Sequence, residues 1–179
     1  MSSKTTSSLW FVSAVLVIVV FLLFFAASIA AKAATADAQL ETAACDFESG
    51  KSLAVKYLAV NAGHDDAPPN GKIWMPGGSA ITLFAETAFT VGGSNIGAGA
   101  YTMYVIPGKK EWKLIVSKNE SVTGPYDEKL DLARTPMEIG PLGQPEPQLR
   151  VSFGRVGPHA CEIDLDYGKT KAWAKMMEK

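Results

Sequence analysis

The pattern of apolar and polar positions changes sharply along the chain. Residues 9–31 form an unbroken apolar stretch, whereas apolar and polar residues alternate with a period of two from Ser52 onward. In residues 52–60 this alternation puts Leu53, Val55, Tyr57 and Ala59 on one face. A period of two is typical of a half-buried β-strand. The pattern therefore predicts one apolar helix followed by a β-domain.

Two hairpins stand out in the alternating part. Residues 100–118 contain two alternating runs around Pro107-Gly108, and residues 149–155 and 161–167 form a second pair around a Gly-Pro turn. Shorter strands are expected near 80–85, 88–91 and 130–139, the last at an edge or a bulge because of Pro136. About eight short strands separated by turn residues predict a mainly β fold, an antiparallel β-sandwich over residues 52–168.

The apolar stretch contains 23 residues without a charge, and its members include Leu9, Trp10, Phe21, Phe24, Phe25, Ala27 and Ala31. A helix of this length measures roughly 34 Å, enough to cross a bilayer core of about 30 Å. The apolar region of a signal peptide usually has only about 7–15 residues. However, Ala31-Lys32-Ala33 fits the small-x-small pattern that signal peptidase cleaves. A retained anchor and a cleaved leader are therefore both open.

The distribution of charge orients an anchored chain. Lys4 and the α-amine are the cations before the stretch, which favours a cytoplasmic segment 1–8 and an extracytoplasmic body. We therefore expect a single-pass membrane protein in which residues 32–51 link the helix to the sandwich. Residues 169–179 are expected to form a tail or short helix. At helical spacing Trp173, Met176 and Met177 share a face there that caps the sandwich or docks on a partner.

Composition narrows the function classes. Residues 32–179 carry 16 basic and 18 acidic side chains, a net charge of −2 without a basic block, which argues against nucleic acid as a partner. The two cysteines, Cys45 and Cys161, are expected to form one disulfide in an oxidising compartment.

Two groups of residues are candidates for a metal-binding or catalytic site. His64, Asp65 and Asp66 are three possible metal ligands in a row, but adjacent residues rarely converge on one ion, so a solvated turn is the preferred interpretation. Glu162, Asp164 and Asp166 form a carboxylate stripe that could hold Ca²⁺ or act in a hydrolase. The preferred interpretation is an outward strand face that pairs across the strands with Arg150 and Arg155. No haem, zinc, phosphate-loop or serine hydrolase motif is recognised. We expect no cofactor and no enzymatic activity.

Trp74, the run PGGSAIT (76–82) and the run AGAYTMYVIPGKKEW (98–112) resemble the bacterial family called domain of unknown function 2911. The family pattern is W-x-x-G-A-N-E-x-T, a spacer, A-G-x-Y-x-x-x-x-I-P and a later Trp. The resemblance covers roughly residues 53–167 and is strongest over 74–112. The matching residues are Ala98, Gly99, Tyr101, Ile106, Pro107 and Trp112.

The resemblance implies an exported β-sandwich without an established activity. Together with the predicted anchor, it implies a single-pass protein of the bacterial inner membrane whose main domain is periplasmic. Ser79-Ala80 replaces the Asn-Glu of the pattern, and Met75 stands where Arg is usual. If that polar cluster forms a site in relatives, its replacement here implies a chain without catalysis.

These observations lead to two functional hypotheses. The first is a non-catalytic accessory subunit that packs its helix into a larger bacterial membrane complex, of respiratory or photosynthetic reaction-centre type, and braces the periplasmic face. Its partners would be membrane lipid and integral membrane subunits. The alternative is a cleaved, soluble periplasmic module that binds a small molecule or a glycan.

Overall fold

Antiparallel β-strands make up most of the chain that the computed structural model describes, residues 38–62 and 68–179. The prediction of a mainly β, antiparallel fold is confirmed. The strands are β1 (Gln39–Asp46), β2 (Ser52–Ala59), β3 (Ile81–Ala85), β4 (Phe89–Val91), β5 (Ser94–Ile96), β6 (Gly99–Ile106), β7 (Trp112–Ser117), β8 (Asp131–Gly157) and β9 (Ala160–Glu178), with 3₁₀ turns η3 (Pro76–Gly78) and η4 (Glu128–Leu130).

The predicted apolar helix at 9–31 and the metal candidates His64, Asp65 and Asp66 lie outside the described residues. Among the residues that are described, no helix has both the length and the apolar character needed to span a membrane.

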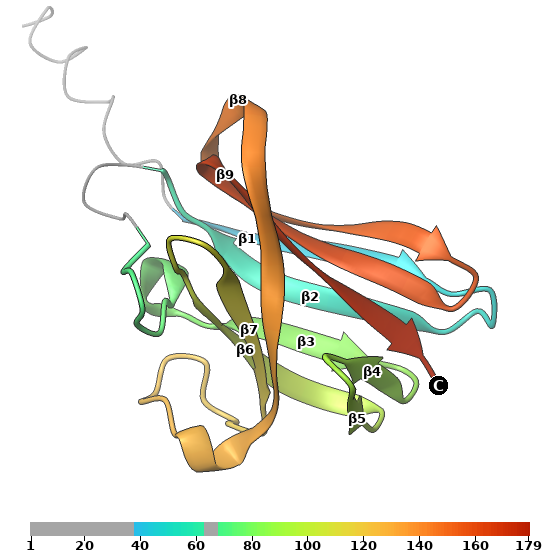
Figure 1. Cartoon of the computed structure of the whole chain (residues 1–179). Coiled ribbons are helices and arrows are strands. Elements are labelled where there is room, and N and C mark those ends of the chain that lie inside the picture. Colours follow the sequence, from blue (N-terminus) through green and yellow to red (C-terminus); the bar gives the residue numbers. More distant parts are fainter. Residues whose placement is uncertain (1–37, 63–67) are drawn as a thin grey trace, which may run out of the picture. The chain divides into compact units, whose positions relative to one another are not determined.

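The long strand β8 connects two layers of a sandwich-like sheet. The strands follow the order β1-β2-β3-β6-β7-β8-β9-β4-β5. β8 pairs with β7 as far as Met137 and with β9 from Glu138 onward, so it leaves one layer and enters the other (Figure 1). Pro136 therefore has a partner strand, β7, on one side only. This agrees with the edge position predicted from the sequence, and on the open side the missing N–H of proline loses no hydrogen bond to a neighbouring strand.

The prediction that residues 32–51 form a linker is wrong for most of the residues that the structure describes, 38–51. Residues 39–46 form the edge strand β1. The alanines and the acidic residues of this strand, Ala43, Ala44, Glu41 and Asp46, have low β-propensity. The segment is a strand because every residue from Gln39 to Asp46 pairs with β2. The β-domain thus begins at β1 and not at Ser52.

The prediction of a short helix at residues 169–179 is also wrong. This segment continues β9, pairing with β8 and, near its end, with β4. Ala172, Ala174 and Met176 are buried at strand spacing, and that burial outweighs the local preference of Ala, Lys and Met for helix.

A large core cluster that includes Trp74 packs between the layers. The ring centroid of Trp74 lies 5.8 Å from that of Trp112 and 5.0 Å from that of Tyr167, both in edge-to-face geometry. The predicted disulfide between Cys45 and Cys161 is confirmed, and both cysteines are buried. This bond joins β1 to β9, two strands that the sheet order keeps far apart.

Candidate functional site

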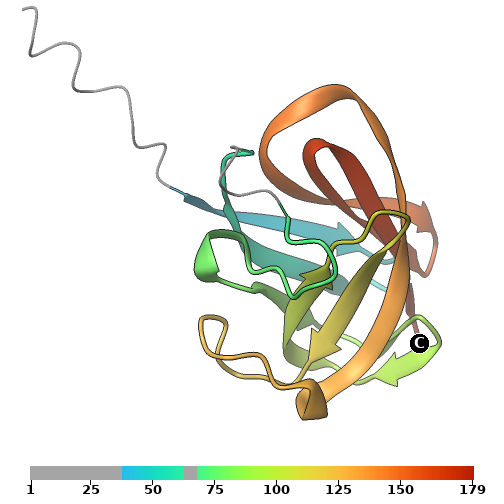
Figure 2. The same ribbon diagram turned by 60° about the vertical axis from the view of Figure 1, so that its left-hand side comes forward.

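The ribbon formed by β8 and β9 bends sharply. Pro141 pairs with Thr170, Glu146 with Gly168 and Arg150 with Asp166, with a register shift between each pair and the next, so β8 supplies more residues at the bend than β9. Gly168 turns the inner strand with a φ of 57°. Figure 2 shows the result, with β8 as an outer loop around the tight turn of β9.

The bend brings together side chains that an extended strand would hold far apart. Glu162, Asp164 and Asp166 lie before Gly168, whereas Lys171 and Trp173 follow it. In a straight strand Asp164 and Lys171 would stand about 23 Å apart. Here the Lys171 amine donates a hydrogen bond of 2.8 Å to the Asp164 carboxylate.

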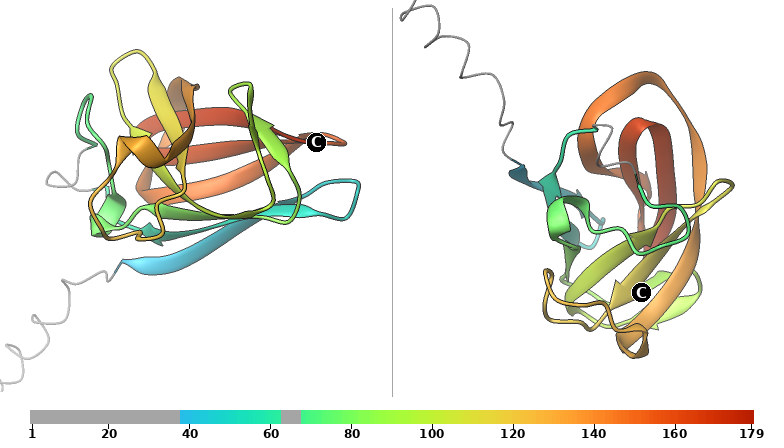
Figure 3. Two further views of the ribbon diagram at one scale, coloured as in Figure 1. Left: turned by 90° about the horizontal axis from the view of Figure 1, so that it is seen from below. Right: turned by 90° about the vertical axis from the view of Figure 1, so that its left-hand side faces the viewer.

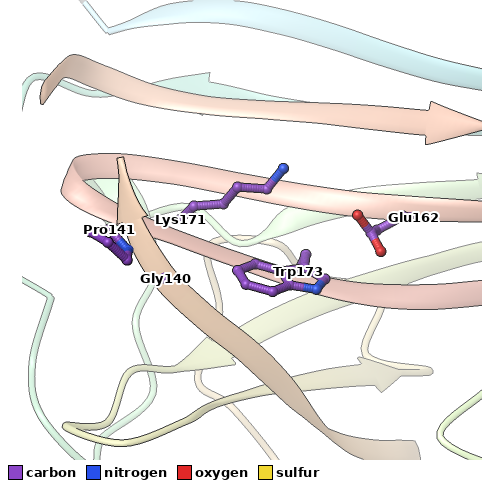
Figure 4. Close-up of a pocket in the computed structure, with 5 residues that line it drawn as sticks. All are labelled: Gly140, Pro141, Glu162, Lys171 and Trp173. Carbon is purple, nitrogen blue, oxygen red and sulfur yellow. The ribbon is translucent and has the colours of Figure 1, made fainter. Parts of the chain in front are cut away.

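A pocket of about 500 Å³ opens beside this contact, lined by Gly140, Pro141, Glu162, Lys171 and Trp173. In Figure 4 the Trp173 ring lies between Gly140 and Pro141 on one side and Glu162 on the other, and Lys171 lies above it. The Lys171 amine is 5.8 Å from the ring centroid, in cation–π range. A Cβ atom at Gly140 would come within 3.3 Å of the ring, so the glycine lets the indole lie close to the backbone of β8.

The charges around the pocket are held in place. The hydrogen bond to Asp164 raises the pKa of the Lys171 amine, which therefore stays protonated at neutral pH. Arg150 donates to the buried Asp166 carboxylate at 2.6 Å. Glu162 forms no ion pair with any described residue and remains the available carboxylate of the pocket.

The sequence-based interpretation of the carboxylate stripe is partly confirmed. Asp166 pairs with Arg150 across the ribbon as predicted. Arg155 does not pair with the stripe but with Glu48, at 3.0 Å. Within residues 38–62 and 68–179, no group of three or more histidine, cysteine or acidic residues is arranged to hold a metal ion.

The docking patch predicted at Trp173, Met176 and Met177 is divided between two faces. Because the segment is a strand, Met176 points into the core and is fully buried, whereas Met177 is 48% exposed. Trp173 belongs to the outer face with Met177. The approach of Trp173 to Glu162 and Lys171 could not be predicted, because no pattern in the neighbouring residues indicates the bend at Gly168.

The positions that depart from the family pattern lie elsewhere, under the segment before η4. Ala80 is buried with Tyr104 and Ile115, and Met75 packs against this cluster. The Ala80 amide donates to the Val122 carbonyl at 2.8 Å. Ala80 and Met75 thus make apolar contacts here, whereas the Tyr104 hydroxyl of the same cluster accepts a hydrogen bond from the Asn119 side chain at 2.8 Å.

Comparison with known proteins agrees with the resemblance read from residues 74–112. The model of a family described as "Protein of unknown function (DUF2911)" matches residues 41–176. No curated protein and no solved structure matches the chain.

Proposed function

Because the chain belongs to a family described as a protein of unknown function (DUF2911), we propose its function from the geometry of its own residues. It is a non-catalytic accessory subunit of a bacterial membrane complex. Residues 9–31 anchor it in the inner membrane, and the β-domain braces the periplasmic face of the complex. The host is of respiratory or photosynthetic type.

The disulfide between Cys45 and Cys161 carries this proposal. Structural disulfides persist in oxidising compartments and are rare in the cytosol, so the bond supports a periplasmic domain. The sequence supplies the means of attachment, because the uncharged stretch at 9–31 precedes β1 by only seven residues, 32–38. A periplasmic domain with so short a connection acts at the membrane surface.

The state of the acidic groups supports a role without catalysis. Paired acid catalysis needs carboxylates that can exchange protons with a substrate. Asp166 is held by Arg150 and Asp164 by Lys171, so both are committed to ion pairs. Glu162 alone leaves the stripe without a second free acid.

An intact-mass measurement of the native protein tests the proposal. The protein is purified from membranes in mild detergent together with whatever accompanies it. We expect a mass near 19.1 kDa and co-purifying integral membrane proteins. A soluble protein lacking about the first 33 residues, the position of the small-x-small pattern, would contradict the anchor. The variant Ala31→Leu/Ala33→Leu removes that pattern and supplies the mass of an uncleaved chain as the reference.

The pocket at Trp173 favours a second candidate, a soluble periplasmic module that binds a glycan. The partly buried indole of Trp173 offers an apolar face to the C–H face of a sugar, while Glu162 and Lys171 can hydrogen-bond its hydroxyl groups. A volume of about 500 Å³ accommodates one or two sugar rings.

Calorimetric titration with chitotriose and maltotriose tests this candidate. We expect saturable binding of one of them to the wild-type chain and a loss of at least tenfold in affinity for Trp173→Ala. Trp173→Phe keeps an aromatic face and should retain part of the affinity. Equal binding by Trp173→Ala, or no binding of either sugar to the wild type, would count against a glycan in this pocket.

A further inference from the structure

A second depression, outside the pocket at Trp173, lies at the turn between β6 and β7. This turn projects beyond the two layers of strands (Figure 3). The depression measures about 530 Å³ and is lined by Asn70, Gly71, Ile106, Pro107, Gly108, Lys109, Lys110, Glu111, Lys113 and Arg134. Four of these ten side chains are basic and one is acidic.

Three of the four basic groups are not neutralised. Lys109, Lys110 and Lys113 are exposed and form no ion pair with any described residue. Arg134 differs, because its guanidinium is bound by Asp131 at 2.7 Å and by Glu128 at 3.2 Å. Three ammonium groups against the single carboxylate of Glu111 make this depression locally cationic, although residues 32–179 carry a net charge of −2.

The backbone beneath the lysines is held in place. A Cβ atom at Gly108 would lie only 2.4 Å from the carbonyl oxygen of Glu111, so the turn closes tightly there. The Gly71 amide donates to the Pro107 carbonyl at 2.7 Å and fixes the neighbouring loop against the turn. Lys113 stands in register between Ile106 and Pro136. The three lysines therefore extend from a preorganised frame around one hollow.

We propose that this depression binds the phosphate group of an anionic ligand, either a soluble phosphate compound or the headgroup of an anionic phospholipid. Lysine binds phosphate as a point charge, and several ammonium groups suit an anion with up to two charges and three acceptor oxygens. A carboxylate carries only one charge and two oxygens, so it would neutralise fewer of the three ammonium groups than a phosphate group would. The site is independent of the accessory role, since none of its residues belongs to the anchor, the disulfide or the pocket at Trp173.

The test uses the full chain in neutral detergent micelles, with its lysines ¹³C-methylated, a change that keeps their charge. Inorganic phosphate and pyrophosphate are titrated at constant ionic strength, with acetate as the reference anion. In parallel, dihexanoyl phosphatidylglycerol is compared with dihexanoyl phosphatidylcholine. We expect saturable shifts of the methyl signals of Lys109, Lys110 and Lys113, identified by single Lys→Arg variants.

Isothermal titration calorimetry compares the affinities of the wild type and the variants, because the lysine methyl signals are lost when these lysines are replaced. The variant Lys109→Ala/Lys110→Ala/Lys113→Ala should bind the responding ligand at least tenfold more weakly. The control Lys51→Ala/Lys56→Ala/Lys175→Ala removes the same charge from exposed positions elsewhere and should stay within twofold of wild type. Circular dichroism checks that both variants fold.

A response to phosphate or pyrophosphate but not to phosphatidylglycerol identifies a soluble ligand. A response to phosphatidylglycerol but not to the soluble anions identifies a lipid headgroup, and a response to both supports a site for the phosphate group that the two share. Shifts that acetate reproduces equally, an equal loss in the control variant, or no saturable shift with any probe would overturn the phosphate site.

Discussion

Replacing Cys45 and Cys161 together by alanine is expected to lower the free energy of unfolding by about 4–5 kcal/mol. The two cysteines are 116 positions apart in the sequence, so the bond closes a very long loop in the unfolded chain. In the chain-entropy model the stabilisation grows with the length of that loop. Equilibrium urea denaturation of the wild type and the double variant measures the difference, as the midpoint multiplied by the slope.

Reduction of the wild-type protein provides the matched control, because it breaks the same bond without removing any side-chain atoms. Reduced wild type and the double variant should unfold at similar urea concentrations. Unfolding of the oxidised and reduced proteins at the same midpoint would contradict a stabilising role for the disulfide. It would also weaken the proposed periplasmic location, which the disulfide carries.

The variant Trp74→Ala is expected to lose about 3–5 kcal/mol of stability. Trp74 is 6% exposed and touches both Trp112 and Tyr167, so its removal opens a cavity and breaks two edge-to-face ring contacts. These rings lie on the chain before β3, on β7 and on β9, and the indole therefore ties both layers together. Thermal and urea unfolding followed by far-ultraviolet circular dichroism check this value.

Trp173→Ala serves as the comparison, since it removes the same side chain from a half-exposed position. Its effect on stability should be clearly smaller than that of Trp74→Ala. Similar losses for the two variants would mean that the indole of Trp173 is a structural part of the ribbon bend. In that case the pocket beside it would be a poor candidate for a binding site.

The local sequence was sufficient for the hairpin of β6 and β7 and for the pairing of β8 with β9. In both cases the period of two decides which side chains point inward, and a Gly-Pro or Pro-Gly turn brings neighbouring runs together. The disulfide could also be predicted, because two cysteines that follow an apolar stretch most often pair with each other. These features depend on residues close in sequence or on simple counting.

Strands β1 and the end of β9 could not be read from the sequence. Residues 39–46 combine two alanines with polar residues, and residues 169–178 are rich in alanine, lysine and methionine, so their intrinsic preferences favour helix or leave the choice open. Their conformation is set by neighbouring strands, β2 for the first and β4 and β8 for the second. β-propensity measures largely this fit to neighbours, so it is weakest as a guide at the two ends of the domain.

Both candidate sites were decided by the tertiary structure. The sequence by itself determined the strand faces, the cysteine pair and the apolar stretch at residues 9–31. Only the bend at Gly168 brought Lys171 and Trp173 to Glu162, and only the loop beside Pro107 completed the hollow under the three lysines. The alternation of apolar and polar side chains is a property of a few consecutive residues. A pocket needs several segments to come close together, and that depends on how the whole domain packs.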